Sequence, residues 1–335
     1  MEDNQAILIK RLVLVSILLA IVVIGLGAYT RLTHAGLGCP DWPGCYGLID
    51  VPETAEQIAA AEKAFPERPV EPQKAWNEMI HRYFAGSLGL LVLAIAFLSV
   101  KNRHSGRPLM LPLLILSIII FHAALGMWTV TLKLMPIVVM AHLLGGFTTL
   151  CLLFLLHLRL KQYRLPSGDW GIKRYGKFAL LGIVILLIQI ALGGWTSSNY
   201  AALTCTELPI CQSGWVERLS FDQTFDLIPP ERETYEFGFL GHNERLTIHV
   251  FHRLGAIVTT IYLLWLSLAI LMRSHTEFFK RAAISVIAIL FVQVALGISN
   301  VWFSLPLSVA VGHNLVAVCL MLSLIALTYG LRRKI

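Results

Sequence analysis

The chain has 335 residues, of which 56% are hydrophobic and only 14% are charged, whereas about 25% of the residues in an average soluble protein are charged. This composition excludes a soluble globular enzyme, a disordered chain and a disulfide-dense secreted domain. The formal charge of +7 does not by itself indicate nucleic-acid binding, because the placement of the 27 lysines and arginines decides its meaning. At roughly 20 residues per membrane span, the length allows about eight spans and their loops.

Long uncharged runs predict eight transmembrane helices. The last run, Ala282–Leu331, is too long for one helix and suits two, broken near Ser304-Leu305-Pro306. Open strands cannot cross a bilayer, and barrel strands would alternate apolar and polar residues, which these runs do not. The other six runs are Leu12–Thr30, Tyr83–Val100, Pro108–Leu132, Leu134–Leu158, Phe178–Thr206 and Leu254–Met272.

The distribution of positive charge predicts how these helices are oriented. With the N-terminus inside, 17 of the 27 lysines and arginines fall in inner segments, among them Lys10, Lys101 and Arg159. Short basic loops stay on the cytoplasmic side of a membrane. We therefore expect both termini in the cytoplasm and the two long loops outside, with membrane lipid and no nucleic acid around the chain.

The helices repeat in two sets of four. Ile80-His81-Arg82 has a counterpart 171 residues later in Phe251-His252-Arg253, and Gly27 has one 166 residues later in Gly193. Four spans per repeat is an even number, so both repeats share one orientation. We expect an all-α integral membrane protein whose eight transmembrane helices form two tandem four-helix-bundle repeats, related by a pseudo-twofold axis along the membrane normal. The repeats are residues 1–160 and 161–335.

A shorter motif occurs three times, in the form of a polar residue followed four positions later by glycine. It is found at His122–Gly126, Gln189–Gly193 and Gln293–Gly297, each ending in Ala-Leu-Gly. The favoured interpretation is that small residues let neighbouring helices pack closely.

Four histidines are expected at one depth in the membrane. His81 and His252 open the second and sixth predicted helices, and His142 and His313 lie about two turns into the fourth and eighth. Polar residues inside a membrane are costly and usually functional. One imidazole pair per repeat suits axial ligation of a haem inside a four-helix bundle, whereas zinc would need three or four ligands per site.

Two arginines and a further histidine accompany these candidate ligands. Arg82 and Arg253 each follow the first histidine of a pair, and we expect them to meet haem propionates. His249 is an alternative to His252, because it lies three residues away on the same helical face. The repeat register, and the arginine that follows, favour His252.

The two repeats differ in their chemistry at equivalent positions. Glu78 occupies the position of His249, and it is either a solvated residue at a helix start or an acid–base group. The first repeat also has His34 and His122 where the second has Tyr200 and Gln293. These differences predict that the first repeat carries out chemistry and that the second is a plain electron-transfer site.

Four of the six cysteines lie in the exported loops. Cys39 and Cys45 have the same spacing as Cys205 and Cys211, and an oxidising compartment favours a disulfide in each pair. Each disulfide is either a structural staple or a redox-active pair. The remaining two, Cys151 and Cys319, lie within predicted helices and are expected to be packing residues. A Cys-x-x-Cys-His sequence does not occur, which excludes covalent c-type haem.

Two motifs carry a resemblance to a known family. The stretch RLTHAGLGCPDWPGC at 31–45 resembles the first outer loop of haem A synthases, and EMIHR at 78–82 resembles their first ligand helix. The resemblance extends to the helices of His142 and His313 and to Phe251-His252-Arg253, and it covers nearly the whole chain. The paired loop cysteines resemble those of bacterial members.

The resemblance implies a function. Haem A synthases oxidise the C8 methyl group of haem O to a formyl group, giving haem A for cytochrome oxidases. By resemblance, residues 1–160 hold the substrate haem O on His81 and His142, with Glu78 as the catalytic residue. Residues 161–335 hold a haem b cofactor on His252 and His313. The resemblance also implies the bacterial inner membrane as the location, and haem O synthase and cytochrome oxidase assembly factors as partners; a homo-oligomer stays open.

Two other functions compete with this one. A dihaem b-type membrane cytochrome that only transfers electrons, for example from quinol, fits the histidine pairs equally well, but Glu78 and the outer-loop motif favour the enzyme. A transporter built from parallel repeats would need unwound helices or charged midplane residues, and the sequence indicates neither.

Overall fold

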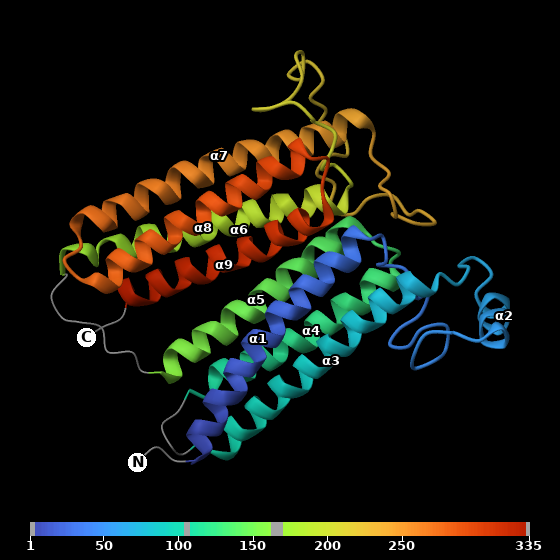
Figure 1. Cartoon of the computed structure of the whole chain (residues 1–335), viewed down its shortest axis with the longest axis horizontal. Helices are drawn as coiled ribbons and strands as arrows, with labels where there is room; N and C mark the ends of the chain where they lie inside the picture. Colours follow the sequence, from blue (N-terminus) through green and yellow to red (C-terminus); the bar gives the residue numbers. More distant parts are fainter. Residues whose placement is uncertain (1–3, 104–107, 162–169, 333–335) are drawn as a thin grey trace. The chain divides into compact units, whose positions relative to one another are not determined.

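The computed structural model describes residues 4–103, 108–161 and 170–332 (Figure 1). Within these residues, eight helices are long and apolar enough to cross a membrane, which confirms the all-α class and the predicted number of spans. The connection between the last two helices falls at the predicted break near Ser304. The eight helices are α1 (Asn4–Leu32), α3 (Pro72–Lys101), α4 (Met110–Thr131), α5 (Pro136–Leu160), α6 (Tyr175–Ser198), α7 (His242–Arg273), α8 (Glu277–Trp302) and α9 (Leu307–Arg332). The described residues also include a short helix, α2 (Ala55–Ala64), and a 3-10 turn, η2 (Trp170–Ile172).

Two helices begin well before the uncharged runs that predicted them. Pro72 starts α3 at a position where its fixed φ and missing N–H are favourable, and α7 starts at His242. His81 and His252 therefore lie nearly three turns inside their helices, and the expectation that they open these helices is wrong. Arg82 and Arg253, the charged residues directly before these two runs, lie inside α3 and α7. A charged residue therefore does not mark where either helix starts.

The helix α6 ends earlier than the run Phe178–Thr206 predicted. Its last residue is Ser198, and Tyr200 adopts a left-handed φ of 53°. A residue in this conformation ends a helix and turns the chain away. The rest of the apolar run belongs to the disulfide loop that follows.

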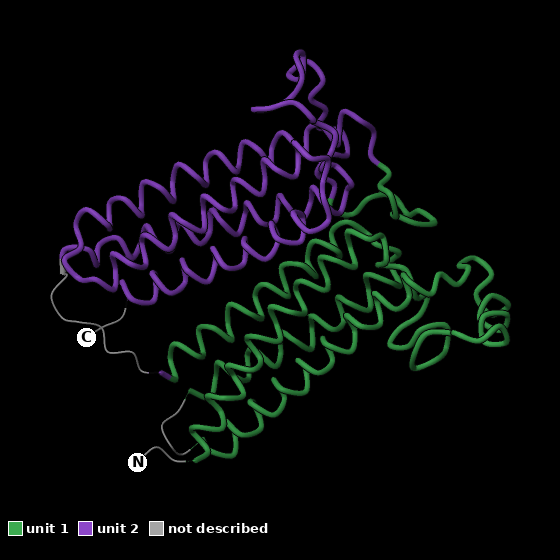
Figure 2. Tube along the Cα trace, viewed as in Figure 1, with its two compact units in different colours: residues 1–160, 227–239 green, residues 161–226, 240–335 purple. Residues whose placement is uncertain are grey.

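Unit 1 is a four-helix bundle that comprises residues 1–160 and 227–239 (Figure 2). In this unit α1 packs against α3 and α5, and α4 packs against the same two helices. This pairing places α3 and α5 diagonally across the bundle. Fully buried apolar side chains, such as Val13 of α1 and Leu150 of α5, fill the interior.

Unit 2 comprises residues 161–226 and 240–335 (Figure 2). Here α6 packs against α7 and α9, and α8 packs against the same two, so α7 and α9 are the diagonal pair. Its interior contains Leu263 of α7, Val286 of α8 and Leu324 of α9, all fully buried.

Large apolar side chains also cover the outside of the helices. Leu90, Phe97 and Phe291 are each more than 60% exposed. Lipid tails are as apolar as leucine, so in a membrane such exposure costs nothing, and small residues and polar contacts decide how the helices associate.

Unit 1 includes a segment from the loop between α6 and α7. Residues 227–239 lie at the end of unit 1 where α4 turns into α5. The Tyr235 N–H donates to the Lys133 carbonyl (3.0 Å), and Glu236 pairs with Arg68 (2.9 Å). This segment therefore belongs physically to the first bundle although the second half of the sequence encodes it.

Both predicted disulfides are present, Cys39–Cys45 and Cys205–Cys211. The other two cysteines, Cys151 in α5 and Cys319 in α9, carry free thiols. Four of the basic residues that predicted the orientation lie outside the described residues, namely Arg107, Arg164, Arg333 and Lys334. The orientation of the chain in the membrane stays a prediction.

The disulfides and the orientation can be tested together by alkylation in intact cells. We expect a membrane-impermeant maleimide to label no loop cysteine until an impermeant reductant is added, after which Cys39, Cys45, Cys205 and Cys211 react. The reason is that these thiols are bonded and the loops face outward. A variant with Cys151 and Cys319 changed to alanine removes background labelling of the helix thiols. Ready labelling of Cys39 or Cys205 without reductant contradicts the disulfides, and protection after reduction contradicts the orientation.

Candidate functional site

His81 and His142 meet in the middle of unit 1. They lie on the diagonal helices α3 and α5, and their ring centroids are 6.4 Å apart at an interplanar angle of 82°. Two imidazoles bound to one metal from opposite sides, with metal–nitrogen distances of about 2.0–2.1 Å, have centroids roughly 6 Å apart. The observed spacing therefore fits a metal ion between the two rings.

A glycine on a neighbouring helix faces each of these rings. A Cβ added to Gly27 of α1 would lie 3.0 Å from His81 Cε1, and one added to Gly126 of α4 would lie 3.3 Å from His142 Cε1. Both distances are shorter than ordinary van der Waals contact. The missing side chains therefore leave room for the imidazoles at the bundle centre.

Unit 2 places its candidate ligands in the same way. His252 and His313 lie on the diagonal helices α7 and α9. A Cβ at Gly193 of α6 would lie 3.1 Å from His252 Cε1, and one at Gly297 of α8 would lie 3.2 Å from His313 Cε1. Each unit thus contains one pair of histidines, and each ring packs against a glycine.

Several nitrogens of these rings have no partner. His81 Nδ1, His142 Nδ1 and His313 Nδ1 are buried and lack a hydrogen bond of normal geometry. In the described part of the chain, no cluster of three or more His, Cys, Asp or Glu could hold a metal ion. Two imidazoles per site suit a haem, whose porphyrin supplies the other four ligands.

Glu78 is buried beside the first pair, one helical turn before His81. Its side chain is 6% exposed. Oε2 accepts from the Cys39 N–H (2.9 Å), and Oε1 accepts from Arg82 Nη2 (2.5 Å). This environment excludes the solvated helix-start interpretation. The carboxylate instead links α3 to the disulfide loop.

Arg82 and Arg253 hold the disulfide loops. Arg82 Nη1 donates to the carbonyls of Asp41 (3.0 Å) and Gly44. Arg253 Nη2 donates to the Cys205 carbonyl (2.5 Å), and its Nη1 donates to the carbonyls of Glu207 (2.7 Å) and Ile210. The structure thus gives both arginines a role that sequence reasoning missed, and their pairing with haem propionates stays a prediction.

His249 acts toward Arg253 as Glu78 acts toward Arg82. Arg253 Nε donates to His249 Nε2 (3.2 Å), and His249 is 4% exposed. Because this nitrogen is already used, the arrangement supports the choice of His252 as the ligand candidate.

Comparison with known proteins now identifies the family. A family model described as "Cytochrome oxidase assembly protein" (COX15-CtaA) matches residues 10–325. The chain is 48% identical over 320 residues to a haem A synthase of Shewanella oneidensis, covering 96% of each chain. It is 28% identical over 317 residues to one of a Chelativorans species (90% of this chain, 84% of the relative) and 25% over 336 residues to one of Rickettsia canadensis (95% and 96%). The chain belongs to the haem A synthase family. The resemblance expected from the sequence is thereby confirmed, as are the disulfide-bonded pairs in its loops.

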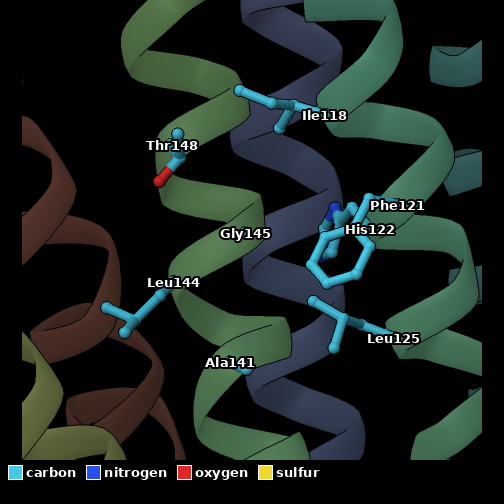
Figure 3. Close-up of a pocket in the computed structure, with 8 residues that line it drawn as sticks. All are labelled: Ile118, Phe121, His122, Leu125, Ala141, Leu144, Gly145 and Thr148. Atoms are coloured by element: carbon cyan, nitrogen blue, oxygen red, sulfur yellow. The ribbon is translucent and has the colours of Figure 1, made fainter.

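His122 adds a third imidazole to unit 1 of this haem A synthase family member. Its ring lies 4.3 Å from that of His142, and it faces a cavity of about 290 Å³ between α4 and α5 (Figure 3). Apart from His122 and Thr148 the lining is apolar, with Phe121 and Leu125 from α4 and Leu144 from α5. The sequence singled out His122 as a difference between the repeats and as the polar residue of the motif His122–Gly126, but gave no sign of the cavity.

His34 lies outside the bundle, just after α1. It has a left-handed φ of 53°, and its ring packs at 5.3 Å from that of Phe237, which belongs to the segment 227–239. Partial burial and the neighbouring Arg31 lower the pKa of this imidazole. The structure therefore places His34 at the loop end of unit 1, apart from the histidine pair.

The glycines that face the histidines yield a direct test. Gly193→Ala adds a methyl group against His252, so the ring must shift, at a strain of about 1–3 kcal/mol, or roughly 5–150-fold in haem affinity. We expect a matching loss of haem b from the purified protein, measured by absorption spectroscopy. The control is Gly89→Ala on α3, where the added Cβ meets no atom within 4 Å. Equal haem content in the two variants would rule out the packing role of Gly193.

Proposed function

We propose that this protein oxidises the C8 methyl group of haem O to a formyl group and so produces haem A. The observation that carries the proposal is the buried Glu78 beside the His81–His142 pair, in a chain 48% identical to a haem A synthase over 96% of its length. A cytochrome that only transfers electrons has no need of a carboxylate beside its ligands.

The proposed arrangement is a tandem repeat of four-helix bundles with a pseudo-twofold axis along the membrane normal. Equivalent connections support it. Lys133 and Leu134, between α4 and α5, have φ values of 50° and 65°, and Ser304 and Leu305, between α8 and α9, have 55° and 64°. Consecutive non-glycine residues of this kind are uncommon, so the same turn at equivalent positions favours duplication. Residues 1–160 would form the substrate half and 161–335 the haem b half.

Each half has its own role in this proposal. His81 and His142 hold the iron of the substrate haem O, and His252 and His313 hold that of haem b. When bound, haem b would supply one-electron transfer. The asymmetry between Glu78 and His249 supports this division, because only the first half has a carboxylate one turn from its ligand.

Glu78 would act as an acid–base group that accepts and relays protons released as the methyl group is oxidised. Oxidation of a methyl group to an aldehyde removes protons as well as electrons, so an acid–base group close to that carbon is useful. The hydrogen bonds from Cys39 and Arg82 fix the carboxylate in place. The disulfide loop then has a positioning role through its Cys39 N–H.

The remaining parts of the proposal concern the surroundings of the enzyme. The distribution of lysines and arginines supports cytoplasmic termini and outward-facing disulfide loops in a bacterial inner membrane. Haem O synthase would supply the substrate, and cytochrome oxidase assembly factors would receive the product.

Replacing Glu78 by glutamine tests the catalytic role. Gln keeps the shape but cannot accept a proton, so we expect haem O or a partly oxidised form to accumulate, with turnover lowered by about 10²–10⁴-fold, while haem b is retained. The measurement is chromatography of haems extracted from cells that carry the variant as their only copy. Glu71→Gln is the matched control, because Glu71 is exposed, precedes the same helix and pairs with Lys74. Near-normal haem A in the Glu78 variant would exclude the role, and loss of all haem would make it structural.

Replacing the proposed haem b ligands tests the cofactor. We expect His252→Ala and His313→Ala each to abolish the low-spin haem b spectrum, since one imidazole cannot complete six-coordinate iron. His249→Ala should retain most of the haem. An intact low-spin spectrum in both ligand variants would refute the assignment. Wild-type protein that contains only haem b, with no haem O or haem A, would favour the dihaem cytochrome.

A further inference from the structure

Residues of the short motif, a polar residue followed four positions later by glycine, contact the candidate histidine ligands. Residues four apart lie on one helical face, so the two members contact the same ring from a neighbouring helix, and we call such a pair a cradle. Three cradles have a polar member. His122 and Gly126 contact His142, Gln189 and Gly193 contact His252, and Gln293 and Gly297 contact His313.

The fourth cradle, around His81, lacks the polar member. Its residues are Val23 and Gly27 of α1. The Val23 side chain cannot form a hydrogen bond, and only its main-chain carbonyl interacts with the His81 ring. His81 Nδ1 therefore has no side-chain partner from this cradle and lacks a hydrogen bond of normal geometry.

Gln189 makes the most complete contact of the three polar members. Its Nε2 lies 3.1 Å from His252 Nδ1 and donates to the His252 carbonyl (3.0 Å). Its Oε1 is buried without a partner. With Oε1 turned toward Nδ1, the carboxamide accepts from an Nδ1–H and gives up its hydrogen bond to the His252 carbonyl. In a metal-bound imidazole the nitrogen away from the metal carries this proton, so Gln189 leaves Nε2 for iron.

Gly255 provides the space for this amide. A Cβ at Gly255 would overlap Gln189 Oε1. The equivalent position in the first repeat, 171 residues earlier, is Phe84. The second repeat therefore has a small residue together with Gln189, and the first has a large one together with Val23.

We propose that Gln189 is a positioning residue that locks His252 as a permanent ligand of haem b. The equivalent residue of the first repeat is Val23, so His81 has no such lock. The absence of a lock suits a site that has to release its haem. The inference rests on the proposed function, because it takes His252 as a haem b ligand. It goes beyond that function because it explains why one haem stays bound and the other exchanges. The explanation lies in residues that do not themselves bind the haem iron.

The test compares two substitutions at Gln189 with opposite expected effects. Gln189→Val installs the residue of the unlocked cradle, and Gln189→Glu keeps an acceptor for Nδ1–H. Partners of this kind raise the basicity of the ligand, and their loss typically costs about 10–100-fold in metal affinity. We expect haem b to leave the Gln189→Val holoprotein about 10–100-fold faster, measured by transfer to excess apomyoglobin. The midpoint potential of haem b should rise in Gln189→Val and fall in Gln189→Glu.

Two further variants separate hydrogen bonding from packing. Gly255→Ala displaces the amide without changing Gln189, so it should reproduce the faster haem loss of Gln189→Val, and the double variant should add little to either. Ile188→Val, at an exposed neighbouring position on α6, is the control and should match the wild type. Potentials that shift in the same direction in Gln189→Val and Gln189→Glu would indicate a packing effect and overturn the inference.

His252→Ala distinguishes failure of this inference from failure of the proposed function. If His252→Ala keeps its low-spin haem b, the assignment of His252 as a ligand is wrong and the inference falls with it. If His252→Ala loses haem b while Gln189→Val matches the wild type in haem loss and potential, only the lock is wrong.

Discussion

One partly buried arginine in each bundle ties the disulfide loop to the helix that carries a candidate ligand. A guanidinium group cannot lose its proton in a protein, and a buried charge is costly unless it is paired and hydrogen-bonded. Arg82 and Arg253 meet this requirement with main-chain carbonyls of the disulfide loops. The loop, its disulfide and the histidine one residue before the arginine therefore form one unit.

The partner of each arginine distinguishes the two bundles. In unit 1 the partner is the Glu78 carboxylate, and in unit 2 it is the His249 imidazole. A carboxylate compensates the charge of the guanidinium, whereas an imidazole that accepts a hydrogen bond through Nε2 is neutral. The same position on two equivalent helices therefore carries a carboxylate in one bundle and a neutral hydrogen-bond acceptor in the other.

Much of this architecture could be predicted from the sequence, because the lipid environment allows few alternatives. Uncharged runs identified all eight spans, and the fixed offsets between repeats selected His81, His142, His252 and His313. Helix boundaries were less predictable. The uncharged runs that predicted α3 and α7 begin only after Arg82 and Arg253, yet both helices start earlier in the chain. In α3 the added turns carry Glu78, which accepts a hydrogen bond from the disulfide loop. The contacts of Glu78 depend on a loop folding back over 39 residues of sequence, and no local pattern records this.

The motif ending in Ala-Leu-Gly shows how a pattern can be noticed and still be interpreted incompletely. Its glycine does allow close approach, as the packing interpretation predicted, but what approaches is an imidazole and not only a helix backbone. The polar member carries the second part of the information, and only the structure shows that Gln189 reaches His252.

The four histidines themselves are common to both repeats, so they cannot explain why two halves of one chain would treat a haem differently. The residues that differ are those around them: Glu78 against His249, Val23 against Gln189, and Phe84 against Gly255. In the proposed duplication the ligands would preserve the binding of iron, and the surrounding residues would be free to change basicity, orientation and exchange. The proposed division of labour between the halves therefore rests on the side chains around the candidate ligands.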